Sequence, residues 1–317
     1  MVAINESNAA TRLNGDGRPV VEIKNVSRQF GNKLALNDVT FRVPAGNVVG
    51  LVGENGAGKT TLIKHILGLL KAQSGTVRVF GLDPVADPVG VLSKIGYLSE
   101  EPDMPGWMRV RELIRYVAAF YPTWDHAYAE RLRQEFELDP VAKVKQLSKG
   151  QRARAGLLIA LAYRPPLLVL DEPSSGLDPI VRRDILGAII RTIADEGRTV
   201  LFSSHLLAEV ERVSDRVAMI KSGRILFCDE LDRIKQTHAR LTLQFPGPQT
   251  KPPSLAGALA WDGSGFEWTA VFAGNAAQFQ SAAAAVGARV VEQSPLSLDE
   301  IFIARSGVQN GASGEEN

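Results

Sequence analysis

The stretch Gly53-Glu54-Asn55-Gly56-Ala57-Gly58-Lys59-Thr60 decides the fold of this chain, because its spacing is G-x-x-x-x-G-K-[ST]. Glycines at these intervals let the backbone wrap around an anion, so that successive N–H groups and the start of a helix face it. Lys59 can then reach the β- and γ-phosphates of a nucleotide, and the Thr60 hydroxyl can bind Mg²⁺. An apolar strand pattern before the loop and a helical pattern after it disfavour the alternative, a simple Gly-rich turn. We therefore predict a nucleotide-binding loop.

Two carboxylates follow a second apolar run. The tetrad Leu167-Leu168-Val169-Leu170 is typical of a strand buried on both faces of a sheet, and Asp171 and Glu172 come directly after it. An acidic group at the end of such a strand can hold Mg²⁺ through water, and the next one can polarise an attacking water. Considered alone, the pair is equally typical of an exposed turn. Combined with the phosphate loop, it predicts Asp171 as the Mg²⁺ residue and Glu172 as the general base.

Strand patterns alternate with helical patterns over residues 20–235, which predicts an α/β fold with a largely parallel sheet. The expected strands are residues 20–25, 36–43, 47–52, 76–80, 95–98, 167–170, 199–203, 216–220 and 224–227. The expected helices are residues 58–70, 110–137 with a break at Pro122, 149–162, 181–196 and 206–213.

The pattern changes near residues 232–238, and the remainder predicts a small α+β domain. We expect strands at residues 241–245, 268–272 and 289–292, helices at 276–286 and 296–304, and a loop at 246–253. The predicted organisation is a flexible tail at 1–19, a nucleotide-binding domain at 20–235, a C-terminal accessory domain at 236–308 and a flexible tail at 309–317.

Composition excludes several classes of protein. The chain has 36 basic and 35 acidic residues, a net charge of +1, which argues against a protein that coats nucleic acid. Its one cysteine, Cys228, excludes an internal disulfide and a thiolate zinc cluster. The longest apolar run, residues 155–163, is about half of the roughly 20 residues that a spanning helix needs. Residues 1–19 lack the apolar core of a signal peptide, so we expect a cytoplasmic chain without nucleic-acid partners.

The segment Leu147-Ser148-Lys149-Gly150-Gln151, ahead of Asp171, resembles the LSGGQ signature of ATP-binding cassette (ABC) ATPases. The order of phosphate loop, LSxGQ, Asp-Glu-Pro, the Ser-Gly-Leu-Asp segment 175–178, and then His205 after a strand is similar to that family throughout. The resemblance covers residues 20–235. It implies a P-loop NTPase fold, with a RecA-like core and a helical subdomain, that binds ATP and Mg²⁺.

The resemblance also implies how the site is built. Two such domains sandwich two ATP molecules head to tail, and Ser148 and Gly150 of one contact the γ-phosphate bound by the other, at a helix N-terminus. Asp178 lies at the dimer interface, His205 contacts the γ-phosphate and the attacking water, and Phe30 stacks on adenine. Local alternatives are a helix N-cap for Ser148, a cap or core histidine for His205, and a core aromatic for Phe30.

The complete set of predicted site residues follows from the motif and the resemblance together. The nucleotide-contacting residues are Phe30, Gly53, Asn55, Gly56, Ala57, Gly58, Lys59, Thr60, Thr61, Ser148, Gly150, Gln151 and Asp178. The catalytic residues are Lys59, Glu172 and His205, and the metal-binding residues are Thr60, Asp171 and Glu100.

Glu100 is a departure from the family pattern. The family has a glutamine after the strand that ends here at Tyr97-Leu98, where it senses Mg²⁺ and water and moves with the membrane partner. A carboxylate in its place adds negative charge beside the γ-phosphate unless the metal neutralises it. We hypothesise that Glu100 is a metal contact with altered gating, the alternative being an inert position.

The segment 103–121 corresponds to the surface that grips a membrane partner in this family. We expect Trp107 and Met108 to be exposed there in a loop, with a local core as the alternative. The segments 121–125 and 296–302 resemble elements of ABC-2-type export ATPases.

We therefore expect an ATPase subunit that powers a separate transmembrane permease, of the ABC-2 export type, from the cytoplasmic face of the membrane. A single phosphate loop requires a second ATPase subunit, either another copy or a related chain. The alternatives are an importer ATPase with a C-terminal regulatory domain, and a soluble ABC ATPase acting on DNA or ribosomes. The latter usually has tandem cassettes, coiled coils or zinc modules, which this sequence lacks. A binding module without turnover is disfavoured by the presence of Lys59, Glu172 and His205.

Overall fold

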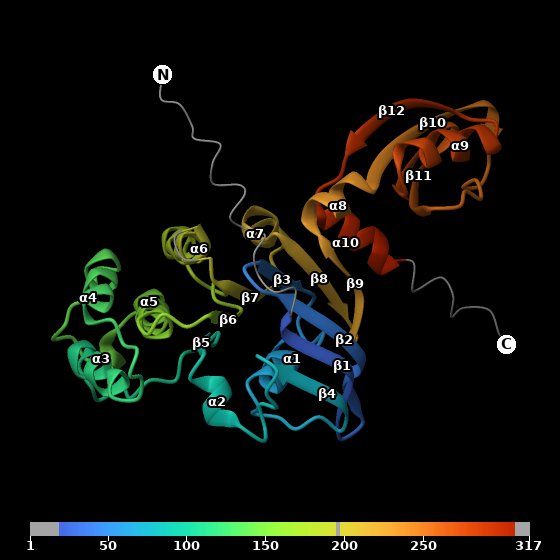
Figure 1. Cartoon of the computed structure of the whole chain (residues 1–317). Helices are drawn as coiled ribbons and strands as arrows, with labels where there is room; N and C mark the ends of the chain where they lie inside the picture. Colours follow the sequence, from blue (N-terminus) through green and yellow to red (C-terminus); the bar gives the residue numbers. More distant parts are fainter. Residues whose placement is uncertain (1–18, 195–196, 308–317) are drawn as a thin grey trace. The chain divides into compact units, whose positions relative to one another are not determined.

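The computed structural model describes residues 19–194 and 197–307, which separate into two units, Met1–Cys228 and Asp229–Asn317 (Figure 1). The division falls within strand β9 (Arg224–Glu230), ahead of the predicted boundary after residue 235. It is displaced because helix α8 (Leu231–Gln236) packs on β10 of the second unit. Of the predicted tails, residues 1–18 and 309–317 lie outside the described residues.

A six-stranded sheet organises the first unit, with the order β5-β6-β7-β3-β8-β9. The strands are β3 (Val48–Val52), β5 (Ile95–Leu98), β6 (Leu167–Asp171), β7 (Thr199–Ser204), β8 (Arg216–Lys221) and β9. The pairs β5–β6, β6–β7, β7–β3 and β3–β8 are all parallel, as the α/β prediction requires. Every residue of β3, β6 and β7 is buried, because helices cover both faces of a parallel sheet.

Three further strands form a separate antiparallel sheet, which the prediction of a largely parallel sheet did not include. They are β1 (Pro19–Phe30), β2 (Lys33–Pro44) and β4 (Ser74–Val79), in the order β2-β1-β4. Buried and exposed residues alternate in the second half of β2, which is typical of a sheet with one solvated face. The inner face packs with helix α1 (Lys59–Ile66) and β3 in one apolar core.

Helices make up the rest of the first unit. They are α2 (Pro88–Leu92), α3 (Val110–Ala118), α4 (His126–Glu135), a 3₁₀ turn (Val144–Gln146), α5 (Lys149–Leu161), α6 (Pro179–Ala194) and α7 (Leu207–Val213). The predicted helical stretch 110–137 is two helices, as the predicted break at Pro122 requires, and the Asp125 side chain caps the second by accepting from the Tyr128 N–H. Residues 195 and 196 of the predicted helix 181–196 lie outside the described residues.

The second unit has the predicted α+β composition. Its strands are β10 (His238–Gln249), β11 (Ala258–Ala273) and β12 (Arg289–Pro295), in the antiparallel order β11-β10-β12, with helices α8, α9 (Ala276–Ala285) and α10 (Leu298–Gly307). The loop prediction at 246–253 is wrong for its first part, because β10 continues to Gln249. Pro246 and Pro248 are tolerated there because they fall inside the register shift between Gln244 and Gln249.

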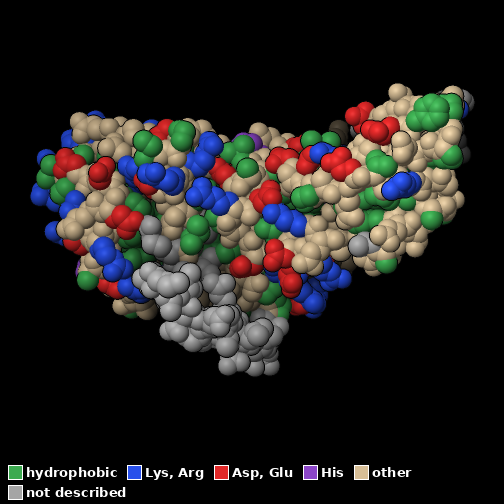
Figure 2. Space-filling view, turned by 90° about the horizontal axis from the view of Figure 1, so that it is seen from above, with side chains coloured by type: hydrophobic (Ala, Val, Ile, Leu, Met, Phe, Trp, Pro, Cys, Tyr) green, Lys and Arg blue, Asp and Glu red, His purple; other side chains and the backbone are tan. Residues whose placement is uncertain are grey.

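The surface matches the balanced composition. Basic and acidic side chains are interspersed on the face that Figure 2 presents. Across residues 19–194 and 197–307, no helix is long and apolar enough to cross a membrane.

Candidate functional site

The phosphate loop connects β3 to α1, and close packing explains its glycines. Gly58 caps α1 with φ of 115°, and a Cβ added to it would lie 2.7 Å from the Ala35 carbonyl oxygen. A Cβ added to Gly53 would lie 2.3 Å from the Ile220 carbonyl oxygen. Helix α1 has no acidic residue in its first turn, so the positive end of its dipole is not neutralised from within. The loop therefore presents an anion-binding helix terminus that no bulkier residue could form.

Lys59 is held directly over this loop. Its side chain is only 5% exposed, and Nζ donates to the carbonyl oxygens of Gly53 at 2.6 Å and Glu54 at 3.1 Å. Nζ also lies 3.0 Å from Oε1 of Glu172. Because a buried cation must be paired, these contacts fix the ammonium at the position where nucleotide phosphates would arrive.

The carboxyl ends of β3, β6 and β7 meet at one edge of the sheet. Register pairs Val52 with Ser204 and Asp171 with Ser203, so the two carboxylates arrive beside the phosphate loop. Ser203 Oγ donates to Asp171 Oδ1 at 2.7 Å, and Thr60 Oγ1 donates to the same atom at 3.3 Å. Burial raises the pKa of Asp171, while these two hydrogen bonds oppose the shift.

Glu172 occupies a strained position between Lys59 and His205. Its φ of 51° is unusual for a residue with a side chain, and its backbone N–H donates to Ser203 Oγ at 3.0 Å. Oε2 lies 2.7 Å from Nδ1 of His205, while Oε1 faces Lys59. Such strain costs about 1–3 kcal/mol and persists where the surroundings impose it, which is common at active sites. A carboxylate oriented in this way by a histidine is the geometry of a general base.

Lys59 and Glu172 line a pocket of about 370 Å³, within the range of roughly 300–1,000 Å³ found for small-molecule sites, whereas Asp171 and His205 are not among its lining residues. Its lining consists of Phe30, Lys33, Ala35, Asn55, Gly56, Gly58, Lys59, Thr60, Thr61, Glu100 and Glu172. Phe30 is 43% exposed, so the alternative of a core aromatic is wrong. Glu100 lies in the pocket as the motif comparison predicted. His205 is partly exposed and bonded to Glu172, so it is not a core histidine.

A second group of predicted residues lies outside this pocket. Ser148 caps α5: its Oγ accepts from the Gln151 N–H at 3.1 Å, and its own N–H donates to Gln151 Oε1 at 3.0 Å. Asp178 accepts from the N–H groups of Ile180 and Val181 at 3.0 and 3.1 Å, which lowers the pKa of its carboxyl group. Within the part of the chain described, neither these residues nor Gly150 lines the phosphate-loop pocket.

The donors around Asp171 fit Mg²⁺ that is shared with a nucleotide. Mg²⁺ prefers oxygen ligands and is commonly held by one or two carboxylates together with substrate phosphates and water. Thr60 lines the pocket and its hydroxyl donates to the carboxylate of Asp171, and Glu100 adds another carboxylate to the lining. Among the residues that the structure describes, no group of three or more His, Cys, Asp or Glu side chains is arranged to hold a metal by itself.

The sequence analysis missed several residues that build the site. Ser203 donates to the Asp171 carboxylate and accepts from the Glu172 backbone N–H, and Lys33 lines the pocket. Glu209 is buried, with Oε2 accepting from Ser174 Oγ at 2.5 Å and Oε1 lying 3.1 Å from Nε of Arg182. The polar pair at the end of the buried strand β7 was a usable signal for Ser203, since it adjoins the predicted His205. No sequence signal distinguishes Glu209 from an exposed helical glutamate.

A second pocket, of about 400 Å³, lies beside the signature motif. It is lined by Glu100, Glu101, Pro102, Asp103, Lys149, Arg152, Ala153 and Leu177. Glu100 therefore borders both this pocket and the phosphate-loop pocket.

Of the two residues expected to be exposed in segment 103–121, the structure exposes only one. Trp107 is 70% exposed, whereas Met108 is 7% exposed and packs with Leu113 and Val144. The expectation for Met108 is therefore wrong. The reason is local: the Met108 N–H bonds to the Pro105 carbonyl, and its own carbonyl accepts from Val144, which turns the side chain inward.

Comparison with known proteins points to one family. Residues 36–175 match the family described as "ABC transporter". The chain is 26% identical over 288 residues to the ABC transporter ATP-binding protein YtrB of Bacillus subtilis, covering 91% of this chain and 98% of YtrB. It is 34% identical over 209 residues to the Nod factor export ATP-binding protein I of Burkholderia lata, covering 64% of this chain and 68% of that protein. Because this chain has 317 residues, the YtrB match extends into the second unit.

Solved structures agree with this match. The chain resembles the ATP-binding subunit of an ABC transporter with a TM-score of 0.63 and 32% identity, covering 68% of this chain and 92% of that one. It also resembles the dimeric ATP-binding cassette MJ0796 bound to ADP and Pi, with a TM-score of 0.60 and 24% identity, covering 67% of this chain and 98% of that one. At that identity the second likeness supports the fold alone.

Proposed function

This chain belongs to the ABC transporter family of ATP-binding proteins, and on that premise we propose that it is the ATPase subunit of an ABC-2-type exporter. Two copies of the chain would form two ATP sites and drive a separate membrane permease from the cytoplasmic face of the membrane.

One observation carries the proposal of a composite site. The pocket of one chain contains the phosphate loop, the base and the aromatic residue, but none of Ser148, Gly150 or Asp178. The phosphate-loop residues and the signature residues are nevertheless both present in the same sequence. Two copies related by a twofold axis would therefore supply each other's missing half, because an isologous pair repeats every contact. Ser148 and Gly150, at the N-terminus of α5, would then face the γ-phosphate held by the partner's Lys59.

The chemistry follows from the contacts around Glu172. When ATP binds, Lys59 exchanges its contact with Glu172 for the β- and γ-phosphates, which frees that carboxylate to accept a proton. Glu172 takes the proton of a water that attacks the γ-phosphorus, and the bond to the bridging oxygen breaks to give ADP and phosphate. His205, bonded to Glu172 through Nδ1, orients the carboxylate and would contact the γ-phosphate and the attacking water. Bound Mg²⁺ would neutralise phosphate charge, held by Thr60, Asp171 and Glu100.

Permease docking is proposed at the pocket beside the signature motif. The pocket carries acidic Glu100, Glu101 and Asp103 together with basic Lys149 and Arg152, so a partner segment with charges of both signs would suit it. Trp107 is exposed in the same segment and would supply an apolar anchor. Because Glu100 borders both pockets, a docked segment would influence the nucleotide site through this residue.

Export is preferred to import for two reasons. The segment 296–302 resembles the C-terminal element of export ATPases, and here it forms the start of α10, which Ser297 begins by bonding to Glu300. One relative is named for Nod factor export. The alternative, an importer ATPase with a regulatory C-terminal domain, shares the same catalytic residues.

The test of the catalytic assignment is Glu172→Gln. The amide cannot accept the proton of water, so we expect ATP turnover to fall by about 10²- to 10⁴-fold while ATP binding persists. Gel filtration with ATP should then show a trapped dimer. Glu267→Gln, the same change on β11 of the second unit, serves as the control. Normal turnover by Glu172→Gln would refute the assignment.

A further inference from the structure

The guanidinium of Arg28 lies over one face of the Phe30 ring, which lines the nucleotide pocket. The guanidinium carbon of Arg28 is 4.7 Å from the centroid of the Phe30 ring. Phe30 lines the phosphate-loop pocket, and its large exposed area leaves the ring without tight packing. A guanidinium over one face of an aromatic ring is attracted by the ring quadrupole and limits how the ring can turn. The face away from Arg28 is then the one left for a nucleotide base.

Arg28 is itself anchored to the segment that follows helix α1. Its Nη1 donates to the Lys71 carbonyl oxygen at 3.1 Å. The neighbouring Gln29 N–H donates to Gln73 Oε1 at 2.7 Å, so the end of β1 is tied to residues 71–73 at two points. These bonds connect the end of β1 to the segment that follows the helix beginning at Lys59.

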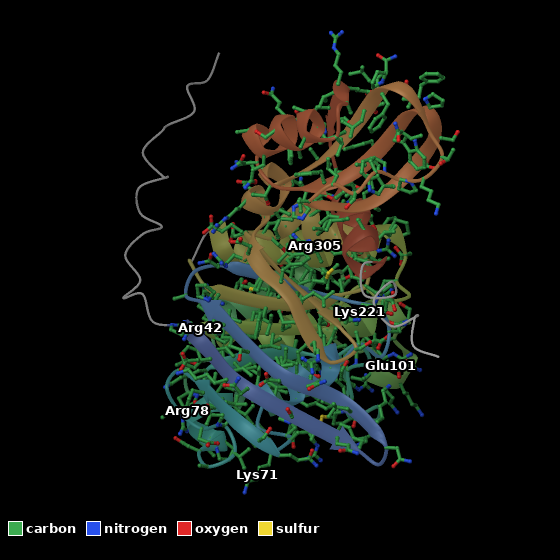
Figure 3. The ribbon with its side chains drawn as sticks, turned by 90° about the vertical axis from the view of Figure 1, so that its right-hand side faces the viewer. Arg42, Lys71, Arg78, Glu101, Lys221 and Arg305 are labelled. Atoms are coloured by element: carbon green, nitrogen blue, oxygen red, sulfur yellow. The ribbon has the colours of Figure 1, made fainter. Side chains whose placement is uncertain are left out.

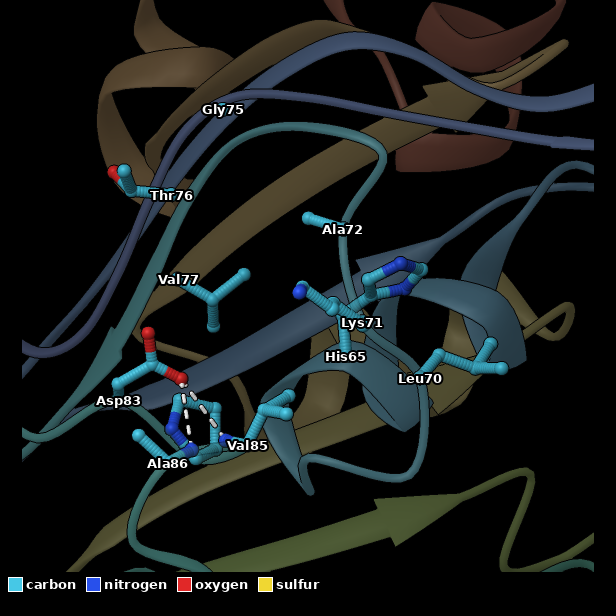
Figure 4. A pocket seen from close by; sticks show the side chains of 11 residues that line it. His65, Leu70, Lys71, Ala72, Gly75, Thr76, Val77, Asp83, Val85 and Ala86 are labelled. Atoms are coloured by element: carbon cyan, nitrogen blue, oxygen red, sulfur yellow. Dashed lines mark hydrogen bonds between the residues drawn. The ribbon is translucent and has the colours of Figure 1, made fainter.

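The charge of Arg28 also influences the pKa of His65, a residue of α1. Burial lowers the pKa of His65, and the positive charge of Arg28 lowers it further. His65 and Lys71 line a separate pocket of about 270 Å³, so the helix and the segment after it lie beside one another (Figure 4). Arg28 therefore lies between the Phe30 ring and the segment that follows α1.

We propose that Arg28 is a positioning residue for the nucleotide base. Its guanidinium, fixed to the Lys71 carbonyl, holds the Phe30 ring so that a purine can stack on the free face at a set distance from the phosphate loop. The proposal rests on ATP being the ligand of this pocket. It predicts an effect confined to the base, since Arg28 does not line the phosphate pocket itself.

The experiment is a double-mutant cycle on ATP binding and turnover, with Arg28→Ala, Phe30→Ala, the double variant and Arg28→Lys. We expect Arg28→Ala to raise both the Kd and the KM for ATP by about 3- to 30-fold, with kcat within about twofold, from the usual strength of such contacts. In the Phe30→Ala background the same change should have no further effect. Arg28→Lys keeps the charge and a donor for Lys71 but not the planar stack, so it should restore part of the affinity.

Two controls separate a positioning role from a structural one. Inorganic tripolyphosphate has no base, so its Kd should be unchanged by Arg28→Ala, whereas damage to the fold would weaken it equally. Arg42→Ala removes the same side chain from the same sheet, at a site remote from Lys71 (Figure 3), and should change neither ligand's affinity.

Several outcomes would overturn the proposal. These are an unchanged or lower Kd for ATP in Arg28→Ala, an additive loss in the double variant, or an equal loss for tripolyphosphate. Wild-type protein that binds ATP without hydrolysing it would contradict the proposed function instead, and the Kd comparison for Arg28 would still be decisive.

Discussion

The phosphate loop and the signature motif are built in opposite ways. At the phosphate loop, the buried Lys59 and Glu172 form an ion pair. The buried Asp171 beside them accepts hydrogen bonds from Thr60 and Ser203. At the signature motif, Ser148 and Lys149 are exposed, and the hydrogen bonds of Ser148 serve only to cap its own helix. The phosphate-loop half of the ATP site is therefore assembled within one chain. The signature-motif half is exposed, where a second copy could contact it.

The largest effect is expected at Lys59, whose buried ion pair distinguishes the phosphate loop from the signature motif. We expect Lys59→Ala to lower ATP turnover by about 10²- to 10³-fold, because it removes the cation that stabilises the transferred phosphate. It also leaves Glu172 buried without its ion pair, which should cost about 3–5 kcal/mol of unfolding free energy. Turnover assays and chemical denaturation measure the two effects. Lys64→Ala, on the exposed face of the same helix, is the control and should change neither.

Ser148→Asp separates the capping role of Ser148 from its role in ATP turnover, because aspartate caps a helix as well as serine does. We expect the free energy of unfolding to change by less than about 0.5 kcal/mol, since Asp replaces the hydroxyl that accepts from the Gln151 N–H. ATP turnover should nevertheless fall by about 10- to 100-fold, because a carboxylate would meet the γ-phosphate of the other copy. Ser148→Ala loses the cap and should show a stability loss of about 1 kcal/mol. If Ser148→Asp turned over ATP normally, the motif would have only a local role.

The smallest expected effect concerns Glu100, which borders both pockets. Removing its charge in Glu100→Gln should raise the Mg²⁺ concentration for half-maximal turnover by about fivefold, because Glu100 is exposed and a unit charge about 4 Å away contributes about 1 kcal/mol in water. A Mg²⁺ titration of ATPase rate measures this shift, with Glu101→Gln as the neighbouring control. An unchanged rate and an unchanged Mg²⁺ dependence would mean that Glu100 is inert.

The sequence was most informative where chemistry fixes the local spacing. The phosphate loop, the buried strand before Asp171 and the cap at Ser148 each depend on residues adjacent in the chain, so pattern alone could predict them. The resemblance to ABC ATPases then assigned roles to His205 and Phe30, and the structure places the first against Glu172 and the second in the pocket.

The residues that escaped prediction depend on contacts between distant segments. Ser203 reaches Asp171 through the register of two parallel strands, which no local pattern encodes. Met108 and Trp107 are neighbours with opposite exposures, because a turn from Pro105 directs one inward. The short helix α2 also went unpredicted, since five residues give no helical period.

Mixing two variants of low activity tests the composite site. Lys59→Ala has a damaged phosphate loop and an intact signature motif, and Ser148→Asp has the reverse. In a mixed dimer, one site combines the intact loop of the second variant with the intact motif of the first. We expect an equal mixture to recover about a quarter of the wild-type ATPase rate. Half of randomly paired dimers are mixed, and each mixed dimer has one complete site of two. A mixture no more active than its components, from variants that fold and exchange subunits, would contradict the composite site.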